Sequence, residues 1–374
     1  MSARTGRRNR RSRRNGRGHA AAVALTTGIT AGAALMLTAC GPDGSLSNGQ
    51  APSPSATGSV KGQAGQGGQQ GDQGSADGKG GSGAGAQGAS AQPAGSAAPA
   101  KLNGTAGTGL TISDGTRYVV MNGTRVDFGT EVRDLAWAPD GHRAVFVDGD
   151  GDLVTAAPDG SDRVVLARNP GGQTWSHPTW RHRDADPQNG FPAADDIFFV
   201  IRAGGVSRLY QIPSGARDGR PTPLPLAGEP TEGMAELPQT GNVWPSAGGR
   251  YGESVYANSD TGKVYIRDDY LRQQGSAITE GSEPAAADTG NDIVFVRSVG
   301  GHDHLFLEHS ADSGPQYTDL TPGATTDYTE PAFAPGGRTV AARTPDGIVT
   351  LPVDGSHAPV KVSGYVGLPA YRTS

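Results

Sequence analysis

The sequence predicts an all-β protein, a six-bladed β-propeller closed by pairing of its N- and C-terminal strands and preceded by a signal peptide and a disordered linker. Three observations lead to this fold. A stretch with the pattern of four short strands occurs at residues 135–166 and recurs at 332–356. Six similar strand openings run through residues 104–374, and the two ends of that region carry complementary parts of one blade.

The clearest copy of the repeat reads LAWAPDGHRAVFVDGDGDLVTAAPDGSDRVVL over residues 135–166. Pro139, Asp140 and Gly141 predict a turn after the first strand, because proline fixes φ and glycine accepts positive φ. The Asp-Gly pairs at 148–151 favour a tight hairpin, and a further Asp-Gly turn precedes the last strand. Four short antiparallel strands form one propeller blade, which needs neighbours on both faces to bury its apolar side chains.

The second copy, AFAPGGRTVAARTPDGIVTLPVDGS, keeps the same order of strands and turns. Phe333 takes the place of Trp137, and Pro335 that of Pro139. Similar openings recur at intervals of 43, 64, 42, 47 and 38 residues. They are Ala136-Trp137, Pro178-Thr179-Trp180, Val243-Trp244, Pro284-Ala285-Ala286, Pro331-Ala332-Phe333 and Pro369-Ala370-Tyr371. Trp244 is followed at once by Pro245, and the fourth opening lacks an aromatic ring, so these two copies depart most from the pattern.

The remaining blade is divided between the two ends of the region. Residues 109–130 contain three strand patterns, two of them joined by the Asn122-Gly123 hairpin, but no strand opening of the repeat. Residues 368–372 supply such an opening and then stop. Joining the two ends completes a sixth blade, and this closure removes exposed sheet edges.

The AWAPDGHR segment and its later Asp-Gly hairpins resemble the TolB-type propeller repeat, a WD-like motif whose usual core is a W-S-P-D-G string. The resemblance covers about residues 135–371. It implies a six-bladed propeller used mainly for protein contacts at the cell envelope. Many propellers of this kind are instead accessory domains of enzymes.

Residues 1–39 have the order of a signal peptide. Eight arginines and no acidic residue occupy positions 1–19, and an uncharged apolar run follows from Ala20. The run ends in Leu37-Thr38-Ala39-Cys40, which resembles the lipobox of bacterial lipoproteins. That resemblance implies cleavage between Ala39 and Cys40 and a diacylglycerol and palmitate modification of Cys40. The other interpretation of Cys40 is a free buried or reactive cysteine, and the export route, general or twin-arginine, stays open.

Residues 40–103 form the expected linker, a tether after the lipidated cysteine that is rich in Gly, Ser, Ala and Gln. Such a segment cannot bury enough apolar surface to offset its chain entropy. Residues 104–374 form the TolB-like propeller domain, and six blades in 271 residues give about 45 residues per blade. Cys40 is the single cysteine, so no disulfide can form within the chain.

The charge of the chain bears on its partners. The full sequence has 32 basic and 37 acidic residues, and loss of the eight arginines in the signal peptide leaves a net charge of about −13. This argues against nucleic acid and against a basic membrane-binding patch. The lipobox and TolB-type resemblances imply a lipid anchor on the extracytoplasmic face of the cell membrane and envelope proteins as partners, and we expect a monomer.

Two clusters could bind metal ions, although we expect no cofactor. Asp148, Asp150 and Asp152 resemble the start of a calcium loop, but the later positions of that loop do not fit and a solvated hairpin turn is the alternative. His302 and His304 have the spacing that places two imidazoles on one face of a strand, an arrangement that zinc or copper can use. They follow Gly300-Gly301 in an expected outer hairpin, away from the central channel.

A third constellation concerns the channel itself. The residues just before the strand openings are Asp134, His177, Glu283, Glu330 and Leu368, with Gly241 or Asn242 in the third copy. Three carboxylates and an imidazole would ring one mouth of the channel, and one interpretation of them is a site for a cation or a basic peptide. The alternative is that a polar residue before proline merely starts a strand at the surface. The aromatic residues of the openings, Trp137, Trp180, Phe333 and Tyr371, are interpreted as core between blades.

The sequence contains no nucleophile elbow, zinc-protease motif, phosphate loop or dinucleotide fingerprint. We therefore expect no catalytic residues and no enzyme, but a non-catalytic protein-binding or scaffolding lipoprotein of the cell envelope. Two alternatives remain open. One is a small propeller lyase or hydrolase that uses His177 and the carboxylates, and the other is a solute-binding or sensor lipoprotein.

Overall fold

The computed structural model describes residues 100–226, 236–249, 252–268, 274–290, 292–311 and 313–373. The expected signal peptide, Cys40 and the linker up to residue 99 lie outside the described residues. Over the part of the chain that the structure describes, no helix is long and apolar enough to span a membrane.

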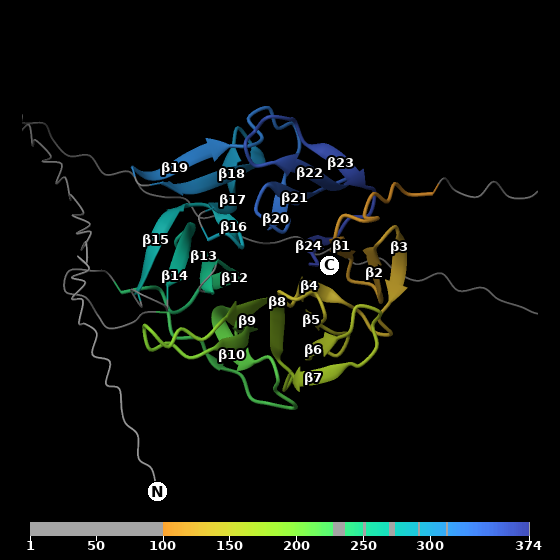
Figure 1. The fold of residues 1–374 in the computed structure, drawn as a ribbon, viewed down its shortest axis with the longest axis vertical. Coiled ribbons are helices and arrows are strands. Elements are labelled where there is room, and N and C mark those ends of the chain that lie inside the picture. The colour runs from red at the N-terminus through yellow and green to blue at the C-terminus, as the bar shows by residue number, and fades with distance from the viewer. Residues whose placement is uncertain are drawn as a thin grey trace, which may run out of the picture. The chain divides into compact units, whose positions relative to one another are not determined.

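The described residues form six antiparallel four-stranded sheets arranged as the blades of a propeller (Figure 1). Blade 1 consists of β4 (Arg133–Trp137), β5 (Ala144–Val147), β6 (Leu153–Ala156) and β7 (Val164–Ala167). Blade 2 consists of β8 (Gln173–Arg183), β9 (Ala194–Ala203), β10 (Val206–Pro213) and β11 (Thr222–Pro223). Blade 3 consists of β12 (Asn242–Gly248), β13 (Glu253–Asn258), β14 (Lys263–Asp268) and β15 (Gln274–Glu280).

The other three blades complete the ring. Blade 4 consists of β16 (Ser282–Ala286), β17 (Asp292–Val299), β18 (His302–Ala311) and β19 (Gly314–Asp319). Blade 5 consists of β20 (Thr329–Phe333), β21 (Thr339–Thr344), β22 (Gly347–Pro352) and β23 (Val360–Ser363). Blade 6 consists of β24 (Leu368–Tyr371), β1 (Leu110–Ser113), β2 (Tyr118–Met121) and β3 (Thr124–Asp127). The predicted all-β, six-bladed fold is confirmed, and every predicted opening falls on an innermost strand (Figure 1).

Blade 6 is shared between the two ends of the propeller, as predicted. Ile112 on β1 lies opposite Pro369 on β24 in an antiparallel register. The C-terminal segment also reaches blade 1, where Nε of Arg372 donates to the carbonyl oxygen of Gly141 at 2.7 Å. A Cβ atom on Gly141 would lie 1.9 Å from the carbonyl oxygen of Thr373, and the φ of Gly141 is +67°. The turn glycine is therefore required both by its backbone conformation and by the close approach of the chain end.

The apolar core lies between neighbouring blades. One cluster joins Phe128 of blade 6 to Trp137 and Phe146 of blade 1, and Phe128 and Phe146 meet edge to face at 5.8 Å between ring centroids. Another joins blades 1 and 2 through Phe199 and its neighbours. Further clusters lie between blades 2 and 3, between blades 4 and 5, and between blades 5 and 6. Stability therefore depends on contacts between neighbouring blades.

Polar contacts link the innermost strands to one another. The hydroxyl of Thr179 on β8 accepts a hydrogen bond from the backbone N–H of Ala247 on β12 at 3.0 Å. The hydroxyl of Ser246 on β12 accepts one from the N–H of Ala286 on β16 at 3.2 Å. These bonds connect β8 to β12 and β12 to β16 beside the channel.

Candidate functional site: the mouth of the central channel

Five innermost strands carry one residue in the left-handed backbone region at the same place. In each case the pairing register to the next strand shifts across that residue, which marks a β-bulge. The five residues, with φ between 48° and 54°, are Asp134, His177, Trp244, Glu283 and Glu330. A bulge redirects a side chain from the pleat. Four of the five line the cavity along the channel, and the fifth, Asp134, contacts His177.

The third member of this ring corrects the sequence alignment. The sequence pattern aligns Trp244 with the core residue Trp137 and so predicts Gly241 or Asn242 at the mouth, but this alignment is wrong. Trp244 is the left-handed residue of β12, so it corresponds to Asp134, and Ala247 corresponds to Trp137. The proline that follows Trp244 marks the correct alignment, since Trp244-Pro245 matches His177-Pro178, Glu283-Pro284 and Glu330-Pro331.

The sixth position differs in its backbone. Leu368 precedes Pro369 and lines the cavity, but it is absent from the residues with positive φ and the pairing of β24 with β1 is regular. The mouth therefore has five bulged positions and one flat one.

The carboxylates of the ring bind the backbone of the following blade. Oδ2 of Asp134 accepts a hydrogen bond from the N–H of His177 at 3.0 Å, and it lies 3.8 Å from Nδ1 of the same residue. Oε2 of Glu283 accepts a hydrogen bond from the N–H of Glu330 at 2.7 Å. One role of these two carboxylates is thus to stabilise the next bulge, where the backbone N–H would otherwise lack a partner.

Glu330 has a different environment. Its Oε1 atom forms an ion pair with Arg343 at 2.9 Å, whereas its Oε2 atom is buried and has no hydrogen-bonding partner among the described residues. Burial raises the pKa of Glu330 to about 7 in spite of the Arg343 guanidinium, and the negative charges of Glu283 and Asp134 add to the rise. Burial likewise raises the pKa of Glu283. The carboxylates of Glu283 and Asp134 are therefore close enough to Glu330 for their charges to raise its pKa.

The opposite part of the ring is aromatic. The imidazole of His177 and the indole of Trp244 lie 3.6 Å apart between ring centroids, inclined at 50°. Burial lowers the pKa of His177, although the charge of Asp134 opposes that shift. The imidazole is accordingly neutral at pH 7, so the positive charge at the mouth comes from Arg343.

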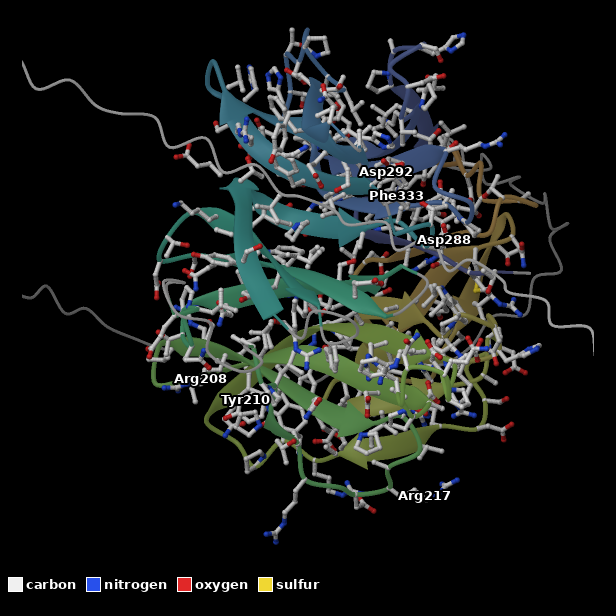
Figure 2. All side chains as sticks on the ribbon, turned by 60° about the vertical axis from the view of Figure 1, so that its left-hand side comes forward. Arg208, Tyr210, Arg217, Asp288, Asp292 and Phe333 are labelled. Carbon is white, nitrogen blue, oxygen red and sulfur yellow. The ribbon has the colours of Figure 1, made fainter. Side chains whose placement is uncertain are left out.

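A cavity of about 390 Å³ runs along the channel behind this mouth. Among the residues that line it are Trp137, Trp180, Phe333 and Tyr371, of which Trp137 is buried and the other three are half-buried. These aromatic residues pack against the clusters between blades, as core residues would, and also face the channel. Figure 2 views the propeller obliquely and labels Phe333 on β20 and Asp288 after β16, both of which line the cavity.

Arg343 is a residue of the mouth that sequence reasoning missed. It lies on β21, opposite Thr329 of β20, and its charge reaches the ring from the second strand of the blade. The sequence offers one signal, an arginine in an otherwise apolar strand pattern, but nothing local shows that its partner is Glu330.

The two candidate metal clusters are not among the residues that line the cavity. Oδ1 of Asp148 accepts hydrogen bonds from the N–H groups of Asp150 and Asp152, both at 3.0 Å, which closes the hairpin turn. On β18, Nδ1 of His302 lies 3.2 Å from Asp327, and Nδ1 of His304 lies 2.9 Å from Asp319. Each imidazole therefore contacts its own carboxylate. The described residues contain no group of three or more side chains placed to hold a metal ion.

Comparison with known proteins bears on the fold. No family model and no curated protein matches the chain. Solved structures similar to it include TolB from Acinetobacter baumannii, with 15% identity and a TM-score of 0.49, covering 70% of this chain and 65% of that one. Another is a structure assigned as TolB from Agrobacterium tumefaciens, with 15% identity and a TM-score of 0.49, covering 69% and 90%.

A puromycin-hydrolyzing peptidase from Mycobacterium tuberculosis is also similar, with 12% identity and a TM-score of 0.41, covering 68% of this chain and 44% of that one. At these identities the likeness concerns the fold alone. The described part of the chain is a six-bladed β-propeller, as its strand pairing shows, and it is similar to TolB.

Proposed function

We propose that this chain is a non-catalytic binding protein of the bacterial cell envelope and that its propeller docks a protein partner at the channel mouth. The observation that carries the proposal is the ring of side chains set on left-handed backbone around an open cavity. Unfavourable backbone conformations persist where function keeps them and the surrounding structure over-determines them. A docking surface needs only shape and charge complementary to its partner. The mouth has an open cavity and the carboxylates of Glu283 and Glu330, which suit a partner with a basic segment.

The lipobox motif supports the location. Residues 1–39 would direct export, and lipidation of Cys40 would leave the propeller on the extracytoplasmic face, tethered by residues 41–103. Two acyl chains hold a protein firmly on a membrane, whereas one chain binds only marginally. Cys40→Ser should therefore move the protein from the detergent phase to the aqueous phase in a detergent phase-partition assay. Equal partitioning of the variant and the parent would contradict lipid anchoring.

The docking proposal is tested by removing charge from the mouth. The variant Asp134→Asn, Glu283→Gln and Glu330→Gln removes three carboxylates, and its matched control, Glu131→Gln, Glu280→Gln and Asp346→Asn, removes three exposed ones. Both proteins are used to capture partners from membranes of the producing bacterium. The mouth variant should retain several-fold less partner, with residual binding less sensitive to salt, and the control should behave as the parent. Equal retention by all three proteins would overturn docking at the mouth.

A second function has an observation of its own in its favour. Glu330, with a pKa of about 7, and the neutral His177 imidazole line the same cavity, and such groups can exchange protons at neutral pH. A lyase or hydrolase would need these groups within reach of a bound substrate. The test is whether the parent protein releases a product from an envelope substrate. If it does, and if both Glu330→Gln and His177→Asn lose this activity, the enzyme is favoured over the docking module.

A further inference from the structure

The mouth of the channel is asymmetric. The bulged residues follow the order of the blades, so His177 and Trp244 are neighbours on one side, while Glu283 and Glu330 are neighbours on the other. Asp134 lies beside His177, and its charge still acts on Glu330. A ligand at this mouth would therefore meet an aromatic surface and a carboxylate surface together.

On the carboxylate side, Glu330 carries a buried acceptor atom that has no partner among the described residues. The side chain of Glu330 is 11% exposed, Arg343 binds its Oε1 atom, and its Oε2 atom is buried without a partner among the described residues. A buried carboxylate oxygen without a donor is costly, because it has lost its hydration and gained nothing in return. A ligand that donates a hydrogen bond to this atom would remove that cost.

The surroundings favour an organic cation over a metal ion. Hard cations such as calcium need six to eight oxygen ligands. The described residues offer no group of three or more side chains placed to hold a metal. A guanidinium group suits the site better, because it is planar, stacks on aromatic rings and spreads its charge over several N–H donors.

The cavity can also accept the chain that carries such a group. Its volume of about 390 Å³ lies within the usual range of pockets for small ligands. The innermost strands place small residues two positions after each mouth residue, which leaves the channel axis open behind the ring. They are Ala136, Thr179, Ser246, Ala285, Ala332 and Ala370.

We propose that the channel mouth binds the guanidinium group of an arginine side chain, with Glu330 Oε2 as its acceptor and Trp244 as its stacking surface. This inference rests on the proposed docking function and names the group of the partner that enters the channel. The guanidinium donates to Glu330 Oε2, its alkyl chain lies in the cavity, and its plane faces the indole. The partner is thus a protein that presents an exposed arginine to the propeller.

Proton linkage follows from this arrangement. The guanidinium binds the carboxylate form of Glu330, whose pKa of about 7 leaves roughly half of it protonated at neutral pH. The other groups that act on Glu330 are the Arg343 cation and the Glu283 and Asp134 carboxylates, and His177 across the mouth is neutral. Affinity should therefore rise about tenfold between pH 6 and pH 8, and binding at pH 7 should release protons.

The test is calorimetric titration of the full-length protein in detergent with N-acetylarginine amide. N-acetylcitrulline amide, a neutral isostere, and N-acetyllysine amide are the matched probes. The arginine probe should bind at least about tenfold more tightly than the citrulline probe, which is the low end for a hydrogen bond to a charged group. It should also bind more tightly than the lysine probe, because ammonium lacks the planar face that stacks on an indole.

The variants separate the contributions to binding. Glu330→Gln should weaken arginine binding about tenfold and abolish its pH dependence. Trp244→Leu should weaken binding but leave the pH dependence intact, since it removes only the stacking surface. The control Glu131→Gln, at an exposed carboxylate, should behave as the parent. Circular dichroism and melting temperature establish that each variant is folded.

Two results would overturn the inference. One is equal binding of arginine and citrulline probes, and the other is unchanged arginine binding by folded Glu330→Gln. Because the probes are small molecules, either result leaves the capture experiment with the triple variant unaffected. If the triple variant loses its partner while the arginine probe gives no heat, docking at the mouth stands and arginine is not the group recognised.

Discussion

The innermost strands β4 and β12 have the same backbone conformation at their bulge but carry different side chains there, a carboxylate on β4 and an indole on β12. Asp134 and Trp244 share a φ near +54° and sit at a register shift of the same kind. Three residues later, β4 carries the large aromatic Trp137, whereas β12 carries Ala247. The feature that blades 1 to 5 share is therefore the bulge on the innermost strand, and not the aromatic residue that makes the β4 repeat conspicuous.

The difference between the two strands separates fold from function. Trp137 is 7% exposed, and its Nε1 donates to the hydroxyl of Thr111 in blade 6 at 2.9 Å, so it joins two blades. Trp244 is half-buried and contacts His177 across the mouth. A side chain at the bulge can change from carboxylate to indole without changing the blade, which leaves that position available for recognition.

The largest effect should come from opening the ring, on which both strands depend. Deleting residues 368–374 removes β24 from blade 6 together with the bonds from Arg372 and Thr373 to blade 1. The deletion exposes the edge of β1 and the apolar faces beside it, so the domain should fail to fold or should aggregate. Thermal unfolding followed by circular dichroism tests this. A cooperative transition at the parent's melting temperature would show that the shared blade is dispensable.

The next largest effect should be the loss of stability when Trp137 is truncated, compared with the loss when Trp244 is truncated. Trp137→Ala should cost about 3–5 kcal/mol of unfolding free energy, as other buried aromatic truncations do. Trp244→Ala should cost less, because its ring is only partly buried at the channel mouth. Urea denaturation of both variants gives the two values. Equal losses would mean that Trp244 is a core residue and that the revised alignment of β12 is wrong.

Most of the fold could be predicted because its signals are local. Asp-Gly pairs and proline turns set the strand boundaries, and the incomplete blades at residues 109–130 and 368–372 indicated the ring closure. The register of β12 could not be predicted from the aromatic signature, since that strand has no aromatic residue at the position of Trp137. The X-Pro dipeptide was the better marker, because it accompanies four of the five bulges.

The site was only partly predictable. Asp134, His177, Glu283 and Glu330 could be placed at the mouth because they hold the same position in their repeats. Their individual roles depend on contacts between blades, which a repeat pattern does not contain. The pairing of Arg343 with one oxygen of Glu330, leaving the other without a partner, is such a contact. Burial, which decides the pKa of Glu330, also emerges only from packing.

Glu330, the bulged residue of blade 5, should make the stability of the protein depend on pH. Folding raises the pKa of Glu330 from its usual value of 4.5 to about 7, so the folded state binds its proton more tightly. Stability from this group is present below pH 4.5 and is lost as the pH rises through 7. Glu330→Gln removes that dependence. The stability of the variant relative to the parent should therefore increase by up to about 3 kcal/mol between pH 4.5 and pH 8.

Urea denaturation at several pH values measures this difference, and Glu131→Gln serves as the control at an exposed carboxylate. His177 does not confuse the comparison, because its lowered pKa acts in both proteins and in the opposite sense, below about pH 6.5. A difference between variant and parent that is independent of pH would mean that folding does not shift the pKa of Glu330.

The smallest expected effect tests directly whether Asp134 and Trp244 share a left-handed backbone conformation. A left-handed conformation costs an L-residue roughly 1 kcal/mol or more, and glycine avoids that cost. At both Asp134 and Trp244, the glycine variant should therefore be about 1 kcal/mol more stable than the alanine variant. The absolute losses should differ, because only Asp134 accepts a hydrogen bond from the next blade. The difference between glycine and alanine should nevertheless be the same at the two positions.

Ser246 lies two residues after Trp244 on β12, has no positive φ and serves as the control. At this position the alanine variant should be more stable than the glycine variant. If glycine gains nothing over alanine at Trp244, its left-handed backbone is not the repeated feature of the ring, and the equivalence of β4 and β12 must rest on side chains after all.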